Sequence, residues 1–490
     1  MSKKREARAR LAPGFRDIAS GQVAARNAMI ETLCGVYARY GFERLETPAI
    51  EYVDVLGKNL PESDEPAGGV FALQDDDDQW ISLRYDLTAP LARVFAQNAQ
   101  NLPRPYRRYQ TGPVWRREKP GPGRFREFYQ CDFDTVGTSA PAADAEVCAV
   151  LCDGLEALGI GAGQYQVRVN NRKILDGVLE VAGIEQQDGT RLTVLRAIDK
   201  LERLGMDGVR DLLTGGRKDK SGDFTKGAGL EGAAVDRIIA YMNTAGATRG
   251  AVCDALDALV GESEAGRTGV AELREIDALL GAMDYAEDRV IFDPSVVRGL
   301  AYYTGPVFEA VLTADIRDAK GRKRDIGSVA GGGRYDDLVT RFTGQQVPAT
   351  GASIGVDRLL TALELLGADK GAPAGPVVVT VMDRDRLVDY QRLANSIRAA
   401  GITAELYLGT SGFRAQMKYA DRRRSPVVVI QGSDEFEAGT VTLKDMQLGA
   451  KLSSEIDDRD EWRKGQPAQC TVPEDQMLGE IRRMLGLEDT

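Results

Sequence analysis

The sequence predicts an α+β protein in which antiparallel hairpins, a long helical segment and a small α/β domain follow one another. Three observations support this class. Strand-like runs flank KPGPG at 119–123, whose prolines and glycines are typical of a turn, so the two runs form an antiparallel hairpin. Residues 172–289 show almost only helical periodicity. Beyond residue 376, strands alternate with helices.

The length and charge of the chain limit its organisation and its partners. A chain of 490 residues exceeds what one core usually organises, so two or three domains are expected. The net charge is −11, from 63 basic and 74 acidic residues, so nucleic acid would have to meet local basic patches. No apolar run reaches transmembrane length, and the N-terminal residues lack the apolar core of a signal peptide. We therefore expect a cytoplasmic protein without a membrane partner.

Two residue types restrict the chemistry. The chain has no histidine, which excludes histidine-based triads and imidazole metal sites. Proton transfer must then use a carboxylate, Tyr, Lys, water or a phosphate of the substrate. The six cysteines stand singly without a CxxC pair, so neither a zinc site nor a disulfide framework is indicated.

The N-terminal elements come first along the chain. A helical pattern follows PGFRDI and ends at Gly41, and the run FERLETPAIEY at 42–52 reads as one strand with Pro48 at an edge position. A second hairpin spans 68–90, and a helix is expected at 87–97. Asp86 precedes that helix, where an aspartate is a typical cap.

The central hairpin carries the strongest functional pattern. Residues 104–126 contain eight Lys or Arg and one acid in an otherwise acidic protein. Even spacing puts Arg116, Glu118, Phe128, Gln130 and Asp134 on one face, where they can converge on a ligand. Guanidinium for phosphate, an aromatic ring for a base, and amide and carboxylate for a polar substrate describe a nucleotide and small-molecule site. The alternative is an ordinary exposed hairpin whose arginines are solvated.

The rest of the chain divides into segments with different patterns. A helix is expected at 144–158, a strand at 164–171, and a mostly helical insertion at 172–289, with a loop at 215–227. Strand patterns return from 290, and three glycines at 331–333 indicate that the backbone approaches another group closely. The small-residue segment 367–376 reads as a linker to an α/β domain with a mixed sheet.

Three stretches resemble one protein family. GPVWRREKPGPGRFREFYQCDFD at 112–134 resembles motif 2 of class II aminoacyl-tRNA synthetases, in its histidyl-tRNA synthetase form. VRGLAYYTG at 297–305 and AGGGRYDDL at 330–338 resemble signatures of that family. Residues 42–52 are similar to motif 1, 349–366 to motif 3, and the C-terminal part to the anticodon-binding domain. The resemblance covers essentially the full length.

The resemblance implies a fold and domain boundaries. It implies a class II antiparallel sheet flanked by helices, with a helical insertion and a C-terminal anticodon-binding α/β domain. The catalytic domain would occupy 1–171 with motifs 1 and 2, and 290–366 with motif 3. The insertion would occupy 172–289, the linker 367–376 and the anticodon-binding domain 377–490.

The resemblance also implies a reaction and its residues. ATP and L-histidine would form histidyl-adenylate, and the histidyl group would pass to histidine tRNA. Arg298 and Arg116 would be catalytic. ATP would be bound by Arg116, Glu118, Arg124, Phe128 and Arg358. Histidine would be bound by Asp86, Leu87, Thr88, Arg116, Gln130, Asp134, Arg298, Tyr302 and Tyr303.

Partners follow in the same way. The tRNA would be contacted by Lys119, Arg414, Lys418, Arg422, Arg423 and Arg424. Mg²⁺ would enter bound to ATP, without zinc, an organic cofactor or a metal site on the protein, and the chain would form a homodimer. The loop glycine at 121 stands where the family's familiar bacterial members offer a glutamine to the tRNA acceptor end, so weaker dependence on the extra 5′ guanine than in those members is expected. The alternative is a catalytically inactive paralogue acting as a regulatory subunit of ATP phosphoribosyltransferase.

Overall fold

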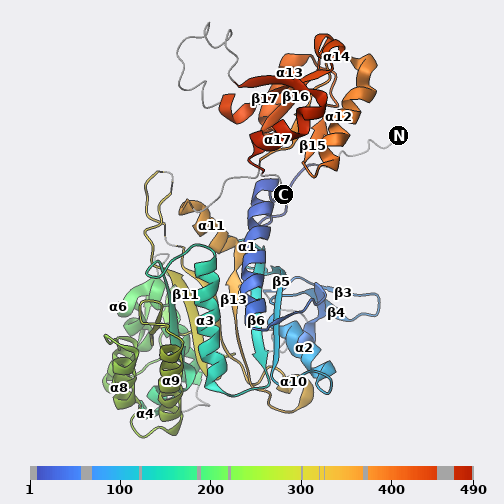
Figure 1. Cartoon of the computed structure of the whole chain (residues 1–490). Helices are drawn as coiled ribbons and strands as arrows, with labels where there is room; N and C mark the ends of the chain where they lie inside the picture. Colours follow the sequence, from blue (N-terminus) through green and yellow to red (C-terminus); the bar gives the residue numbers. More distant parts are fainter. Residues whose placement is uncertain are drawn as a thin grey trace. The chain divides into compact units, whose positions relative to one another are not determined.

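The chain forms two compact units, residues 1–370 and 371–490, each with its own hydrophobic core. The computed structural model describes residues 8–56, 69–120, 124–184, 189–218, 222–299, 302–318, 320–324, 326–367, 374–449 and 468–487. The predicted α+β class is confirmed (Figure 1). Within the described residues, no helix is long and apolar enough to cross a membrane.

An eight-stranded sheet organises the first unit. Its strands, in spatial order, are β1 (Glu43–Arg44), β5 (Tyr106–Trp115), β6 (Glu127–Val136), β13 (Ala349–Gly355), β12 (Ser328–Arg334), β11 (Pro306–Leu312), β7 (Tyr165–Asn171) and β10 (Val290–Phe292). The strands from β5 to β7 pair antiparallel, as predicted, whereas the outer pairs β1–β5 and β7–β10 are parallel. Parallel pairing requires a long crossover connection, and helices α4 to α9 provide it between β7 and β10.

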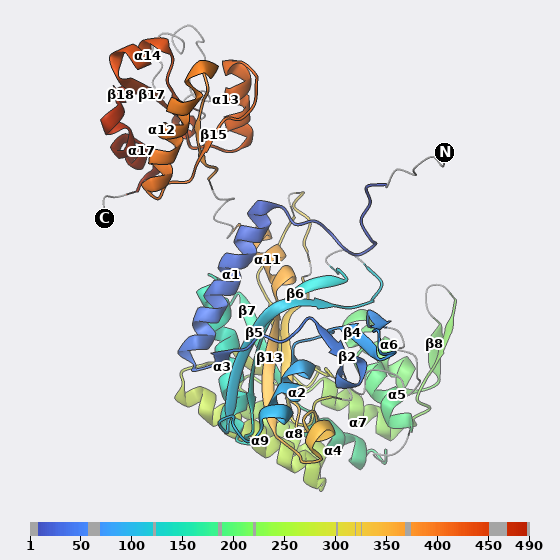
Figure 2. The same ribbon diagram turned by 90° about the vertical axis from the view of Figure 1, so that its right-hand side faces the viewer.

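The two faces of the sheet have different coverings. Helices α1 (Ser20–Arg39) and α3 (Pro141–Ala157) cover one face, while α2 (Thr88–Asn98) and a small sheet lie on the other (Figure 2). Side chains alternate along β6, so Cys131 and Phe133 join the core under the helices. Gln130, Asp132 and Asp134 therefore project from the opposite face.

The run at 42–52 does not form the single strand predicted for it. It divides into β1 and β2 (Ile50–Tyr52), which belong to different sheets. Pro48 lies between them and has no amide hydrogen to continue a ladder. The second hairpin forms as predicted from β3 (Ala72–Gln74) and β4 (Trp80–Leu83), with β2 on the other side of β4.

Among the described residues between β7 and β10, six helices make up most of the segment. They are α4 (Arg172–Val181), α5 (Gly189–Ile198), α6 (Leu201–Leu213), α7 (Gly232–Met242), α8 (Arg249–Val260) and α9 (Glu264–Ala282). The loop predicted at 215–227 contains instead a hairpin of β8 (Gly216–Lys218) and β9 (Phe224–Lys226). Alternation over three residues is too short to indicate these strands from sequence.

The second unit has a mixed five-stranded sheet, as predicted. Its order is β15 (Ala404–Leu406), β14 (Val377–Val379), β16 (Val427–Ile430), β17 (Thr440–Asp445) and β18 (Gln469–Pro473), with the first three strands parallel. Helices α12 (Leu387–Ala399), α13 (Phe413–Arg422), α14 (Ser433–Ala438) and α17 (Met477–Leu485) complete it. The apolar side chains of these elements form a core of their own.

Candidate active site

A cavity of about 500 Å³ lies on the face of the large sheet opposite α1 and α3. Strands β6, β12 and β13 supply its floor, and the segments around Asp86 and Arg298 supply its walls. The lining side chains include most of the predicted site: Asp86, Thr88, Arg116, Glu118, Arg124, Phe128, Gln130, Arg298, Tyr302, Tyr303 and Arg358. Segments separated by more than two hundred residues in sequence thus meet in one pocket.

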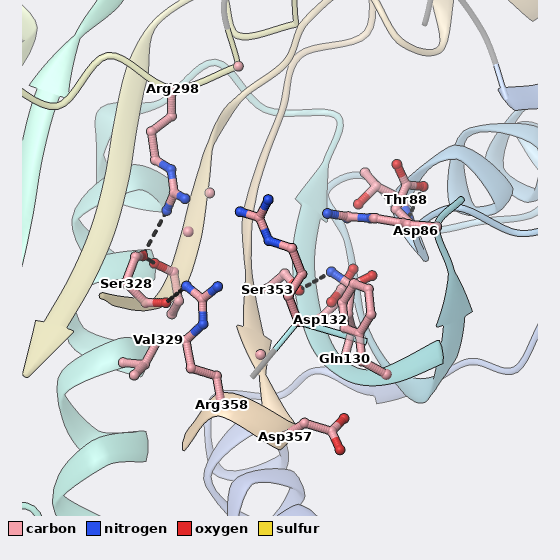
Figure 3. Close-up of a pocket in the computed structure, with 18 of the residues that line it drawn as sticks. Asp86, Thr88, Gln130, Asp132, Arg298, Ser328, Val329, Ser353, Asp357 and Arg358 are labelled. Atoms are coloured by element: carbon pink, nitrogen blue, oxygen red, sulfur yellow. Dashed lines mark hydrogen bonds between the residues drawn. The ribbon is translucent and has the colours of Figure 1, made fainter. Parts of the chain in front are cut away.

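Arg298 and Arg358 lie together at one end of the pocket, and Arg116 also lines it. Nη1 of Arg298 donates to the Ser328 hydroxyl over 2.8 Å, and Nη1 of Arg358 donates to the Ser328 carbonyl over 2.6 Å (Figure 3). Arg298 also pairs with Glu309 at 3.0 Å. Arg116 stacks on Phe128, with its guanidinium carbon 5.1 Å from the ring centroid. Several guanidinium groups directed at one cavity suit a ligand that carries phosphate.

Glycines make room for two of the functional side chains. An added Cβ at Gly331 would lie 2.6 Å from Nη1 of Arg298, and one at Gly333 would lie 2.6 Å from the Tyr303 ring. Both glycines belong to β12, so Arg298 and Tyr303 rest directly on the backbone of the sheet. The close approach predicted for residues 331–333 is therefore confirmed.

The segment leading to Arg298 is held by residues that sequence reasoning missed. Nδ2 of Asn170 donates to the carbonyls of Pro294 and Val296, over 3.1 and 2.9 Å. Asn170 also exchanges hydrogen bonds with Tyr241 of α7, whose hydroxyl is buried. A helix of the segment between β7 and β10 thus helps to position the arginine. No local pattern could have shown this, because the contact joins distant segments.

Other polar groups line the rest of the pocket. Oδ1 of Asp86 accepts from the backbone N–H groups of Thr88 and Ala89, over 3.2 and 2.9 Å, so Asp86 both caps α2 and lines the cavity. Nε2 of Gln130 donates to the Ser353 hydroxyl over 2.6 Å. Tyr302 and Tyr303 meet edge to face, with ring centroids 5.1 Å apart.

Two residues predicted to bind histidine lie behind the pocket wall rather than in it. The Leu87 side chain is fully buried, and its carbonyl accepts from Arg108 over 2.9 Å. Asp134 is paired with Arg108 at 2.9 Å and accepts from the Tyr335 hydroxyl. Even spacing placed Asp134 on the correct face of β6, but its carboxylate faces Arg108 and Tyr335 rather than the cavity.

Asp132 lines the cavity, although the sequence interpretation passed over it. It lies between Gln130 and Asp134 in the same even series, so the period of the strand could have identified it. Burial raises the pKa of Asp132 to about 7, against the opposing effect of Arg108.

The residues predicted to contact tRNA are all exposed. Lys119 follows β5 in the first unit, and the loop residues 121–123 lie outside the described residues. Arg414, Lys418 and Arg422 lie on α13 of the second unit, followed by Arg423 and Arg424. Arg423 forms an exposed ion pair with Glu405 at 2.9 Å.

Comparisons with known proteins agree over both units. A family model described as histidyl-tRNA synthetase matches residues 14–359, and one described as anticodon binding domain matches residues 376–464. The chain is 57% identical over 488 residues to a protein of Cereibacter sphaeroides named histidine–tRNA ligase, with 98% of each chain covered. It is 56% identical over 487 residues to a protein of the same name from Jannaschia sp., with 96% of each covered.

Solved structures give the same match. A crystal structure of histidyl-tRNA synthetase from Nostoc sp. superposes with a TM-score of 0.73 at 28% sequence identity, covering 98% of this chain and all of the other. An apo histidyl-tRNA synthetase structure from S. aureus, at 20% identity and a TM-score of 0.63, supports the fold alone.

Proposed function

The chain belongs to the histidyl-tRNA synthetase family, and from this premise we propose how its pocket ligates L-histidine to histidine tRNA with ATP. Relatives that match nearly the whole chain are named histidine–tRNA ligase, and we infer the same activity here. The observation that supports a histidine and ATP site is the polarity of the cavity. Arg298 and Arg358 occupy one end, while Asp86, Gln130 and Asp132 occupy the other (Figure 3). Such a pocket suits a ligand with a phosphate at one end and a cationic amino acid at the other.

In the first step, a carboxylate oxygen of histidine attacks the α-phosphorus of ATP, and the bond to the pyrophosphate oxygen breaks. Negative charge grows on the transferred phosphoryl group during this displacement. Arg298 and Arg116 are the residues that we assign to stabilise it, because preorganised charges act most strongly in a site that excludes water. Glu118, Arg124, Phe128 and Arg358 would hold the rest of ATP, which enters as its magnesium complex.

In the second step, a hydroxyl of the terminal ribose of tRNA attacks the carbonyl carbon of histidyl-adenylate, and AMP leaves. The hydroxyl proton must go to an acceptor other than histidine, because the chain has none. The substrate phosphate is such an acceptor. For histidine itself, Asp86 and Thr88 are assigned to the ammonium group, and Gln130, Tyr302 and Tyr303 complete the pocket.

The test of this function is histidine-dependent exchange of pyrophosphate into ATP, with each other amino acid as a control. Exchange with histidine alone is expected, and no exchange with histidine would reject the proposal. The regulatory-subunit alternative predicts no exchange. It is disfavoured because Arg298 is present in the pocket and relatives named as ligases match 96% and 98% of the chain.

We propose that the second unit reads the anticodon through the basic face of α13. Truncation after residue 370 should leave pyrophosphate exchange within a few-fold of the parent, because the first unit has its own core. Charging of tRNA should fall by about 10²-fold or more, since one or two base contacts of about 1–3 kcal/mol each are lost. Pre-steady-state measurements of each step would separate the two effects.

Charge-reversal variants refine that test in the full chain. Arg414→Glu with Lys418→Glu should weaken tRNA binding, whereas Arg392→Glu on the exposed surface of α12 serves as the matched control. Full charging efficiency in the truncated chain would show that the second unit does not read tRNA.

We further propose a homodimer formed through the small sheet of β2, β3 and β4. Tyr52, Ile81 and Leu73 form one row across this sheet, and Ile50 precedes Tyr52 on the same face. The exposed fractions are 47% for Ile50, 53% for Tyr52 and 51% for Leu73, so this apolar face is open to a partner. The segment also resembles motif 1, which builds the dimer interface in the family.

Tyr52→Glu with Leu73→Glu should dissociate the dimer, because two carboxylates in an apolar contact are left without partners. Sedimentation equilibrium would distinguish the monomer of 53.1 kDa from twice that mass. Phe224→Glu is the control, because Phe224 is also exposed and apolar but lies on β9. A parent protein that sediments as a monomer would exclude the proposal.

A further inference from the structure

Three side chains that line the pocket have buried polar atoms without a partner. These atoms are Oε1 of Gln130, Oδ1 of Asp132 and the Tyr302 hydroxyl, for which no hydrogen-bond partner exists among the described residues. Leaving a buried polar atom unpaired is costly, and such atoms in native proteins require an explanation. Two of them can only accept, so a ligand that donates N–H groups would satisfy them.

Asp132 differs from the two other carboxylates in this region. Oδ1 of Asp86 accepts from the N-terminus of α2. Oδ1 of Asp134 accepts from the Tyr335 hydroxyl, and its Oδ2, which makes no hydrogen bond within the described residues, forms an ion pair with Arg108. Asp132 has the Ser353 hydroxyl as a hydrogen-bond partner, which leaves Oδ1 unpaired within the described part of the chain. Ser353 also accepts from Gln130, so it fixes both side chains.

The depth of Asp132 indicates which part of histidine it meets. Asp132 lies directly beside Ser353 in the sheet and is 1% exposed, against 7% for Gln130 nearer the hairpin turn. The reacting carboxylate of histidine must face the phosphate at the arginine end. The ammonium group is bound to the neighbouring carbon, so it stays close to that carboxylate. The imidazole ring therefore extends furthest toward the carboxylate end of the pocket.

We propose that Asp132 is a further specificity-determining residue, whose Oδ1 accepts a hydrogen bond from a ring N–H of the bound histidine. This inference rests on the proposed function, because it assumes that histidine occupies the pocket. It assigns to Asp132 the contact with histidine that the family resemblance implies for Asp134. An apolar ring of similar size would leave the Asp132 carboxylate buried and unpaired, which is how a polar pocket rejects an isostere.

The electrostatics of the pocket agree with a donor at this position. Burial raises the pKa of Asp132 to about 7; Arg108 lowers it, while Asp134 and Asp86 raise it. The charged form therefore lacks solvation when the pocket is empty. An imidazole N–H would supply that solvation, and the carboxylate would in turn favour the protonated ring, whose ordinary pKa is about 6.5.

The first test compares Asp132→Asn with the parent in pyrophosphate exchange. The KM for histidine should rise about 10- to 100-fold, as expected for a hydrogen bond to a charged group, while the KM for ATP stays unchanged. An unchanged KM for ATP also shows that the variant folds. Asp153→Asn is the matched control, because Asp153 is a half-buried carboxylate of α3 that accepts from Tyr40 and Tyr285 outside the pocket.

Two histidine analogues, used as competitive inhibitors, identify which group of histidine Asp132 contacts. Imidazolepropionate keeps the ring but lacks the ammonium group, and thiazolylalanine keeps the ammonium group but has no ring N–H. Asp132→Asn should weaken imidazolepropionate as much as histidine and leave thiazolylalanine unchanged. The reverse pattern would overturn the proposal by placing Asp132 at the ammonium group, and an unchanged affinity for both would exclude contact with the substrate.

Nuclear magnetic resonance provides a measurement on the parent protein itself. The chain contains no histidine, so every imidazole signal in a sample comes from the substrate. With ring-¹⁵N histidine, the ring pKa in the bound state should lie at least about one unit above its free value, and Asp132→Asn should abolish the increase. A bound ring that titrates as free histidine does would defeat the inference. Absence of histidine binding and exchange would instead defeat the proposed function.

Discussion

Arg298→Ala is expected to slow formation of histidyl-adenylate by about 10²- to 10³-fold, the usual cost of removing one preorganised charge donor. Arg298 is held on the backbone at Gly331 and directed into the pocket by Ser328 and Glu309. Its charge is therefore in place before the reaction begins. Binding of ATP and histidine should change little, because the interaction strengthens only as charge develops. Single-turnover measurement of adenylate formation gives the rate.

Arg298→Ala needs a control for the Glu309 carboxylate, which it leaves without an ion-pair partner. Without Arg298, the Glu309 carboxylate has lost its ion pair, and its side chain is only 10% exposed. Arg298→Ala with Glu309→Gln removes that unpaired charge and should recover stability without recovering the rate. Glu309→Gln alone keeps the arginine and should remain active. A near-normal single-turnover rate in Arg298→Ala would remove this residue from the mechanism.

Arg108→Met should lower the free energy of unfolding of the first unit by about 3–5 kcal/mol, the cost of breaking a buried ion pair by removing one partner. Arg108 has no exposed side-chain surface, and it pairs with Asp134 and with the Leu87 carbonyl. Burial opposes its charge, but Asp134 and Asp132 outweigh that effect and raise the pKa of Arg108. Urea unfolding followed by fluorescence of Trp80 and Trp115 would measure the change.

Two comparison variants test whether this loss of stability comes from breaking the buried ion pair. Arg44→Met breaks an exposed pair with Glu46, whose side chains are 60% and 70% exposed, so it should cost about 1 kcal/mol or less. Arg108→Met with Asp134→Asn removes both charges and should recover most of the stability. Equal losses for Arg108→Met and Arg44→Met would mean that the buried pair does not support the pocket floor.

Chemistry that depends on residue type and strand period was predictable from the sequence. The absence of histidine excluded imidazole catalysis, and period two along the central hairpin placed Phe128 and Gln130 on the face that lines the pocket. Proline and glycine between strand patterns predicted the hairpin of β5 and β6. These inferences succeed because side-chain direction and turn formation are set by neighbouring residues.

The burial of each side chain and the identity of its partners were decided only by the tertiary structure. Asp132 and Asp134 share one face of β6. Arg108 on β5 and Tyr335 after β12 separate Asp134 from the cavity, whereas Asp132 lines it. The division of 42–52 between two sheets, the parallel outer strands and the link from Tyr241 to the Arg298 segment also depend on partners far away in sequence. A local pattern specifies which way a side chain points, but packing against distant segments decides what it meets there.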